Sequence, residues 1–244
     1  MTGMLASVNS LEEALLVESY NVDVIDLKQP NRGALGALEI ETVSEIVSKL
    51  KSTTTISATV GDLPMQPDVL SDAVEVMAAT GVNYVKMGFF PGGDWLSCIK
   101  RLSDVAAQGH ALIAVLFADA KPDMKIVSAL QQAGFRGVML DTMNKGQGSL
   151  TEIMDIAQLQ NFVQQAKCHG LLTGLAGSLR LQDIACLLPL QADYLGFRGA
   201  LCRLQCRTAQ IDTGQLAQIK HRIGDTQYSN TKINWTAFQE ESYL

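Results

Sequence analysis

Short apolar runs alternate with helix-like segments along most of the chain, and this alternation constrains the fold more than any other feature. The runs are rich in Val, Ile and Leu and are apolar on both faces, which is typical of parallel strands covered by helices. The sequence therefore predicts eight parallel strands at fairly even intervals. These occupy residues 4–7, 22–28, 54–61, 83–89, 112–119, 137–142, 171–178 and 194–200.

The segments between the runs have apolar residues at helical spacing. In Ile40–Leu50, for example, Val43, Ile46 and Val47 fall on one face of a helix. Glycines follow several of these segments, as left-handed C-terminal caps require. The predicted helices are Leu11–Tyr20, Ile40–Leu50, Val69–Ala79, Trp95–Ala107, Met124–Ala133, Ile156–Ala166 and Leu179–Leu188.

Alternating strands and helices predict an α/β fold, a single (β/α)8 barrel of the TIM barrel class. The 244 residues of the chain are close to the roughly 250 that such a barrel needs. A doubly wound sheet is disfavoured because no Gly-x-Gly-x-x-Gly motif follows the first strand. We assign residues 1–222 to the barrel and residues 223–244 to a polar tail that packs on the barrel or on a neighbouring subunit.

The composition indicates a soluble protein that acts on small molecules. Hydrophobic residues make up 47% of the chain, which is enough for a substantial core, and the net charge is −6. This charge argues against nonspecific binding to nucleic acid or to acidic lipid. The N-terminus lacks the basic region of a signal peptide, and no run approaches the roughly 20 apolar residues of a membrane helix. We expect a cytoplasmic location and leave a homo-oligomer open.

The cysteines and histidines do not indicate a metal or cofactor site. The five cysteines are scattered, as expected of free thiols in a reducing compartment. Cys202 and Cys206 form a Cys-x-x-x-Cys pair, but no second ligand pair has zinc-site spacing. His110, His169 and His221 fall at helix ends or before strands, at the wrong end of a barrel for catalysis. We therefore expect no metal ion and no cofactor.

Polar side chains collect at the carboxyl ends of the predicted strands, where barrel enzymes place their functional residues. Asp26 and Lys28 lie two residues apart on the second strand, so their side chains share a face. Lys86 lies on the fourth strand and Asp141 on the sixth, and even-numbered strands contribute to the same layer of a barrel. We expect these four side chains to converge if their heights match.

Lysines beside several carboxylates are suited to imine chemistry. A buried lysine next to another cation loses proton affinity, because burial and like charge both disfavour its ammonium form. The neutral amine can attack a carbonyl to form a Schiff base, after which a nearby base removes a proton from the adjacent carbon. Asp119, at the end of the fifth strand, and Lys145, just beyond the sixth, extend this polar set. The alternative is that these side chains are solvated at the rim of the barrel and have no catalytic role. Burying such charges without a function is costly, however.

The last two predicted strands end in sequences that suit phosphate binding. Gly177 and Ser178 lead into a helix expected to start near Leu179, whose N-terminus would supply N–H donors to an anion. Arg198 and Gly199 end the eighth strand, and the arginine is expected to add a charge-assisted clamp. Barrel enzymes often bind phosphate after these two strands. The alternative is that Gly177 and Ser178 form an ordinary tight turn and that Arg198 is a surface arginine, with no phosphate bound by either.

The same segments, taken in order, resemble one known family over residues 4 to 222. The motifs that carry the resemblance are Val24 to Pro30, Gly33 to Ala37, Ile56 to Asp62, Tyr84 to Gly88, Phe117 to Ala120, Met139 to Thr142 with Lys145, Leu175 to Leu179 and Gly196 to Ala200. Each motif is modest alone, but together and in register they are specific. The family is (5-formylfuran-3-yl)methyl phosphate synthase, also called 4-(hydroxymethyl)-2-furancarboxaldehyde-phosphate synthase.

This resemblance implies a metal-free barrel lyase that joins two glyceraldehyde 3-phosphate molecules, with loss of phosphate and water, to a furan phosphate for methanofuran biosynthesis in one-carbon metabolism. It implies that Lys28 forms the Schiff base and that Lys86 accepts a proton. The residues implied to support imine formation or proton transfer are Asp26, Asp119, Asp141 and Lys145, and those implied to hold phosphate are Gly177, Ser178, Arg198 and Gly199.

The chain departs from the family pattern after Ala200, where Leu201–Arg207 replaces an expected stretch that contains glycine. The phosphate contacts of the last loop are therefore left open. Two other functions also stay open at this point. One is a different class I lysine aldolase acting on a phosphorylated sugar, and the other is a noncatalytic barrel that binds a phosphorylated ligand.

Overall fold

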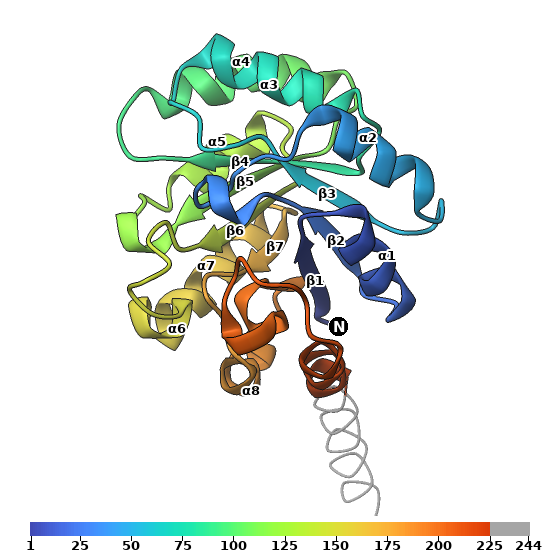
Figure 1. The fold of residues 1–244 in the computed structure, drawn as a ribbon. Coiled ribbons are helices and arrows are strands. Elements are labelled where there is room, and N and C mark those ends of the chain that lie inside the picture. The colour runs from blue at the N-terminus through green and yellow to red at the C-terminus, as the bar shows by residue number, and fades with distance from the viewer. Residues whose placement is uncertain (225–244) are drawn as a thin grey trace, which may run out of the picture.

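A computed structural model describes residues 1–224 and shows a closed barrel of eight parallel strands surrounded by helices (Figure 1). The strands follow one another around the barrel in chain order, and β8 closes it by pairing with β1. The strands are β1 (Gly3–Val8), β2 (Val24–Leu27), β3 (Ile56–Thr59), β4 (Tyr84–Phe89), β5 (Leu112–Phe117), β6 (Gly137–Asp141), β7 (Leu172–Leu175) and β8 (Tyr194–Phe197). The predicted (β/α)8 barrel is confirmed.

The helices that cover the barrel follow the strands, as the predicted alternation requires. They are α1 (Leu11–Ser19), α2 (Ile40–Lys49), α3 (Pro67–Ala78), α4 (Trp95–Ala107), α5 (Ile126–Gln132), α6 (Leu150–Ile153), α7 (Ile156–Cys168) and α8 (Ile184–Leu187). Polar caps fix several of their starts. Asp155, for example, accepts from the backbone N–H of Gln158, and the side chain of Gln158 accepts from the N–H of Asp155.

Alternation along each strand separates two apolar regions and also aims the polar side chains. In β1 and β2, residues Met4, Ala6 and Ile25 belong to the large core between strands and helices. Leu5 and Val24 have the opposite parity and belong to a smaller apolar cluster that includes Met139. A residue two positions further along a strand keeps this direction. Ser7 and Asp26 lie two residues after Leu5 and Val24, so their side chains also point into the barrel.

One predicted element differs in the structure. The helix expected at Leu179–Leu188 is divided into η3 (Leu181–Asp183), α8 and η4 (Leu188–Leu190). Pro189 lies in the last of these turns, and proline removes a backbone donor from a helix. Residues 179 and 180 are not helical, so no long helix begins directly behind Gly177 and Ser178. This corrects the expectation that a helix N-terminus faces the phosphate.

The chain after β8 passes through the short turns η5 (Gly199–Leu201) and η6 (Arg203–Gln205) before a helix over residues 213–224. The bridge between Cys202 and Ile211 closes the loop that contains η6. Among residues 1–224, no helix is long and apolar enough to cross a bilayer. The predicted tail of residues 223–244 lies almost entirely outside the described residues.

Candidate active site

Asp26 lies at the centre of a buried polar cluster inside the barrel. Its neighbours in the strand register are Ser7 on β1 and Ser57 on β3. The carboxylate accepts hydrogen bonds from Ser7 Oγ at 2.9 Å, Ser57 Oγ at 2.6 Å and Lys86 Nζ at 2.9 Å. Burial raises the pKa of Asp26, but the charges of Lys86 and Lys28 and the hydrogen bond from Ser57 lower it by more. The net pKa is below the usual value, so the carboxyl is ionised.

Lys86 reaches Asp26 from β4, where its backbone is in register with Thr59 of β3. The ammonium and the carboxylate form an ion pair in which both side chains are almost fully buried. The hydroxyls of Ser7 and Ser57 satisfy the remaining acceptor positions of the carboxylate, as a buried charge pair requires. The structure thus brings Asp26 and Lys86 together, as the strand positions predict.

Lys28 follows the last residue of β2, and its side chain is buried at the same end of the barrel. Within the described part of the chain, its Nζ has no hydrogen bond or ion pair, although Asp141 and Asp26 lie near enough to act on its charge. Burial lowers the pKa of Lys28, Asp141 partly raises it, and Lys145 lowers it again, with a net value of about 8. The amine is therefore much easier to deprotonate than an ordinary lysine.

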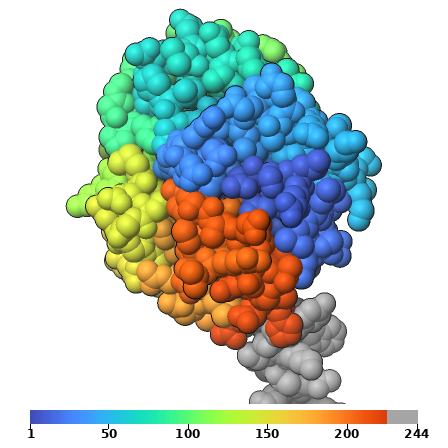
Figure 2. Space-filling model, viewed as in Figure 1, coloured from blue at the N-terminus to red at the C-terminus, as the bar shows by residue number. Residues whose placement is uncertain are grey.

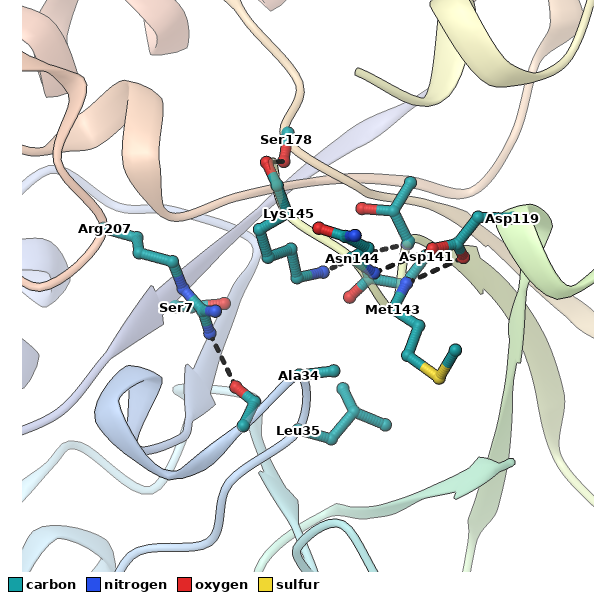
Figure 3. A network of polar contacts seen from close by, with 12 residues as sticks. Ser7, Ala34, Leu35, Asp119, Asp141, Met143, Asn144, Lys145, Ser178 and Arg207 are labelled. Atoms are coloured by element: carbon teal, nitrogen blue, oxygen red, sulfur yellow. Dashed lines mark hydrogen bonds and ion pairs between the residues drawn. The ribbon is translucent and has the colours of Figure 1, made fainter. Parts of the chain in front are cut away.

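A second buried pair forms at the end of β6. Asp141 accepts from Lys145 Nζ at 2.5 Å and from the backbone N–H of Thr142 at 2.7 Å (Figure 3). Burial raises the pKa of Asp141, but the charges of Lys145 and Lys28 lower it below its usual value. Lys28 thus lies near two ionised carboxylates, each of which is also paired with another lysine.

Asp119 contacts backbone N–H groups of a loop and not the lysines that it was expected to assist in proton transfer. Its two carboxylate oxygens accept from the backbone N–H groups of Met143 at 2.8 Å and Asn144 at 2.7 Å (Figure 3). The carboxylate holds the start of the loop that carries Lys145, and it does not line the cavity that contains Lys28. The geometry makes Asp119 a positioning residue for this loop.

Gly177 and Ser178 form a tight turn after β7. Their φ values of 112° and 48° lie in the left-handed region, and a Cβ on Gly177 would come within 2.7 Å of Thr142 Cγ2. The Ser178 hydroxyl donates to the backbone oxygen of Lys145 at 3.3 Å, so it ties this turn to the β6 loop. Among the described residues, the N–H groups of Ser178, Leu179 and Gly199 donate to no backbone oxygen.

Arg198 was expected to act as a phosphate clamp, but its guanidinium contacts other parts of the chain. Its guanidinium forms a buried pair with Glu13 of α1, with the shorter contact at 2.5 Å. The same group also donates to the backbone oxygens of Ser7, Arg207 and Ala209. These partners occupy the donors of the guanidinium. The side chain therefore anchors the loop after β8 to β1 and α1.

One cavity of about 320 Å³ lies at the carboxyl end of the barrel, a size within the range of small-molecule sites. Lys28, Lys86, Asp26, Asp141 and Lys145 line one part of it. The turns after β7 and β8 line another part, and these contain Gly177, Ser178, Leu179, Arg180, Arg198, Gly199, Ala200 and Arg207.

Sequence reasoning missed Ser7, Ser57 and Arg207. Ser7 and Ser57 have the inward parity of Asp26 on neighbouring strands, a signal that register would have revealed. Arg207 lies in an irregular loop, and no periodicity marks its direction.

None of the cysteines in the described part of the chain lines this cavity. Cys202 is buried and its thiol contacts the backbone oxygen of Arg198, while Cys206 is exposed and contacts Thr208. Burial raises the pKa of the Cys202 thiol to about 11. In residues 1–224, no three His, Cys, Asp or Glu side chains are grouped closely enough to hold a metal ion.

The fold and the cavity define a (β/α)8 barrel with three lysines in one cavity at the carboxyl end of its strands, one of them a readily deprotonated amine. Residues 4–220 match the family described as 4-HFC-P synthase, and the chain belongs to that family. The (5-formylfuran-3-yl)methyl phosphate synthase of Methanococcus aeolicus is 30% identical over 210 residues, covering 82% of this chain and 89% of the relative. A Methylorubrum extorquens protein provisionally given the same name is 41% identical over 216 residues, covering 88% and 89%.

Solved structures share the barrel at low sequence identity. Phosphoribosyl anthranilate isomerase from Thermotoga maritima aligns with a TM-score of 0.69 and 13% identity, covering 92% of this chain and all of that one. The 3-hexulose-6-phosphate synthase from Salmonella typhimurium aligns with a TM-score of 0.67 and 15% identity, covering 92% and 99%. At these identities the likeness concerns the fold alone.

Proposed function

We propose that this enzyme condenses two molecules of glyceraldehyde 3-phosphate into (5-formylfuran-3-yl)methyl phosphate through an imine on Lys28. One phosphate and two waters leave, which balances the atoms of the two trioses against the furan phosphate. The observation that carries the proposal is the Lys28 amine, which is buried, unpaired among the described residues and has a pKa near 8. Membership of the 4-HFC-P synthase family supports this product, which would serve methanofuran biosynthesis.

The two buried ion pairs supply the proton transfers that imine chemistry needs. Lys86 is paired with Asp26 and begins as a proton donor to the oxygen that leaves when the imine forms. Once it has given that proton, its free amine is placed to accept one from the carbon next to the imine. The resulting enamine carbon attacks the aldehyde of the second triose. Lys145 and Asp141 form a second buried pair near Lys28.

The phosphate of the triose bound to Lys28 is assigned to the turns after β7 and β8. Ser178, Leu179 and Gly199 line the same cavity as the amine, and their backbone N–H groups have no backbone acceptor in the described chain. N–H groups in left-handed turns form concave anion sites. Ser178 takes part through its backbone, because its hydroxyl is directed to Lys145.

A turnover assay with glyceraldehyde 3-phosphate as the single substrate tests the function. We expect a furan aldehyde, detected by its ultraviolet absorbance, and one inorganic phosphate released for each furan formed. An imine adduct without furan would replace the proposal with another lysine aldolase. Absence of both adduct and furan would favour a noncatalytic barrel that binds a phosphorylated ligand.

Imine formation is expected to depend on pH through Lys28. Its pKa is lowered to about 8, so the reactive neutral amine is the minor form below that pH and the major form above it. The initial rate of adduct formation at low substrate should fall about tenfold for each pH unit below 8 and should level off above it. Rapid-quench borohydride trapping between pH 6 and 9.5 measures this profile. A rate that still rises about tenfold for each pH unit up to pH 9.5, as for the ordinary lysine pKa of 10.5, would contradict the assignment.

Removal of the Asp119 carboxylate should slow turnover without removing the adduct. In D119A the N–H groups of Met143 and Asn144 lose their acceptors, so the loop that positions Lys145 loosens. We expect kcat to fall roughly tenfold, in line with the loss of positioning, while trapping on Lys28 persists. D123A, which changes an exposed carboxylate on a nearby loop, is the matched control. Complete loss of trapping in D119A would show a direct catalytic role.

A further inference from the structure

The cations that line the cavity are mostly neutralised by carboxylates. Six basic side chains line it, namely Lys28, Lys86, Lys145, Arg180, Arg198 and Arg207. Four of them have partners within ion-pair distance: Lys86 with Asp26, Lys145 with Asp141, Arg180 with Glu152 and Arg198 with Glu13. Lys28 and Arg207 are the two without such a partner among residues 1–224.

These two unpaired cations differ in what they can do with their charge. Lys28 can lose its proton, and its lowered pKa shows that the site favours this. Arg207 cannot, because a guanidinium stays charged in proteins. Burial also disfavours the charge of Arg207 and lowers its pKa, and the more distant carboxylates of Asp141 and Asp62 offset this only in part. A half-buried arginine in this state is stabilised when an anion binds beside it.

The geometry of Arg207 leaves most of its donors available. Its guanidinium makes one hydrogen bond to a described residue, from Nη2 to the backbone oxygen of Gly33 at 2.9 Å. Gly33 belongs to the loop after β2, and Asp62 fixes that loop by accepting from the N–H groups of Ala34 and Leu35. Figure 3 shows Arg207 reaching from the loop after β8 toward Ala34 and Leu35, while Lys145 enters from another side. Figure 2 shows the blue and orange segments that carry Gly33 and Arg207 meeting on this face.

We propose that Arg207 forms a second anion subsite, which binds the phosphate of the second triose. Its guanidinium donates to Gly33 on the loop after β2. The phosphate of the triose on Lys28 is assigned instead to the backbone N–H groups of Ser178, Leu179 and Gly199, the last of which lies beside the Arg207 backbone. The inference rests on the proposed function, since that reaction brings two phosphorylated substrates into one cavity. The fork of a guanidinium matches two phosphate oxygens at once, which favours phosphate over a smaller anion.

Inorganic phosphate, titrated by calorimetry into the full chain, tests the subsite without turnover. We expect the wild-type enzyme to bind two phosphates per chain and R207M to bind one. R203M is the matched control because Arg203 is exposed on the same loop and does not line the cavity, and it should bind two. R207K keeps the charge and loses the fork, so its second site should weaken severalfold. Binding of one phosphate by the wild type, or of two by R207M with unchanged affinity, overturns the subsite.

Kinetics distinguish this subsite from a role in loop structure. In R207M we expect the KM for glyceraldehyde 3-phosphate to rise roughly 10- to 100-fold, as for a lost charge-assisted bond, while borohydride still traps one triose on Lys28. Loss of trapping at saturating substrate would show that Arg207 serves the first triose and would overturn the assignment.

The two proposals can fail separately. If the wild-type enzyme binds two phosphates but makes no furan, the proposed condensation is refuted and the subsite stands. If the wild-type enzyme makes furan but binds a single phosphate, the subsite is refuted and the condensation stands.

Discussion

Replacement of Lys28 with methionine is expected to reduce turnover by roughly 10³-fold or more, as for loss of a covalent nucleophile. Methionine fills a similar volume and is suited to an apolar setting, but it has no amine to attack the aldehyde. Lys86 and Lys145 cannot take its place, because each is held in an ion pair with a carboxylate. The measurement is the rate of furan formation from glyceraldehyde 3-phosphate by K28M beside the wild type.

The control for this substitution is K49M, which removes an exposed lysine near the end of α2. It should leave furan formation unchanged. K28R separates charge from nucleophilicity, because arginine keeps a cation near Asp26 and Asp141 but cannot form the imine. We expect K28R to be as inactive as K28M. Substantial turnover by K28M with a folded barrel would show that Lys28 is not the nucleophile.

Breaking the buried pair between Arg198 and Glu13 is expected to destabilise the barrel strongly. In R198M the Glu13 carboxylate remains buried without its partner, and removal of one member of such a pair costs about 3–5 kcal/mol. The backbone oxygens of Ser7, Arg207 and Ala209 also lose a donor. Urea unfolding of R198M measures the loss, and a thermal midpoint lowered by about 10 °C is expected for a domain of this size.

The double variant E13L/R198M identifies the origin of the effect. It leaves no uncompensated charge, so part of the lost free energy of unfolding should return. Recovery should be incomplete because the three carbonyls remain without the guanidinium. If Arg198 were instead a phosphate clamp, R198M would raise KM and leave the stability unchanged. R101M, which breaks only exposed pairs, should change the stability by less than about 1 kcal/mol.

The residues that strand position alone could identify are those at the centre of the site. Asp26, Lys86 and Asp141 lie on strands whose parity and burial follow from the sequence pattern, and Lys28 directly follows one. Side chains two apart share a face, and the carboxyl ends of parallel strands meet at one end of a barrel. The convergence of these residues was therefore predictable from their spacing. Their pairing, with Lys86 on Asp26 and Lys145 on Asp141, was not, because it depends on side-chain reach.

The loop residues could not be placed from sequence. Arg198 has the expected position at the end of β8, but its direction is set by Glu13, which lies 185 residues earlier in the chain. Asp119 was expected to act in chemistry and instead holds two backbone N–H groups of the next loop. Arg207 gave no signal because irregular loops have no periodicity. In each case a hydrogen bond between distant segments decides where the side chain points.

Peptide mapping after borohydride reduction is the most direct test of the claim that Lys28 is a neutral nucleophile. The enzyme is mixed with glyceraldehyde 3-phosphate at pH 8, reduced and digested, and the modified lysine is located by mass spectrometry. The structure predicts one triose phosphate on Lys28 and none on Lys86 or Lys145, since those two amines are held by Asp26 and Asp141. An adduct on either of those lysines with Lys28 unmodified would contradict it.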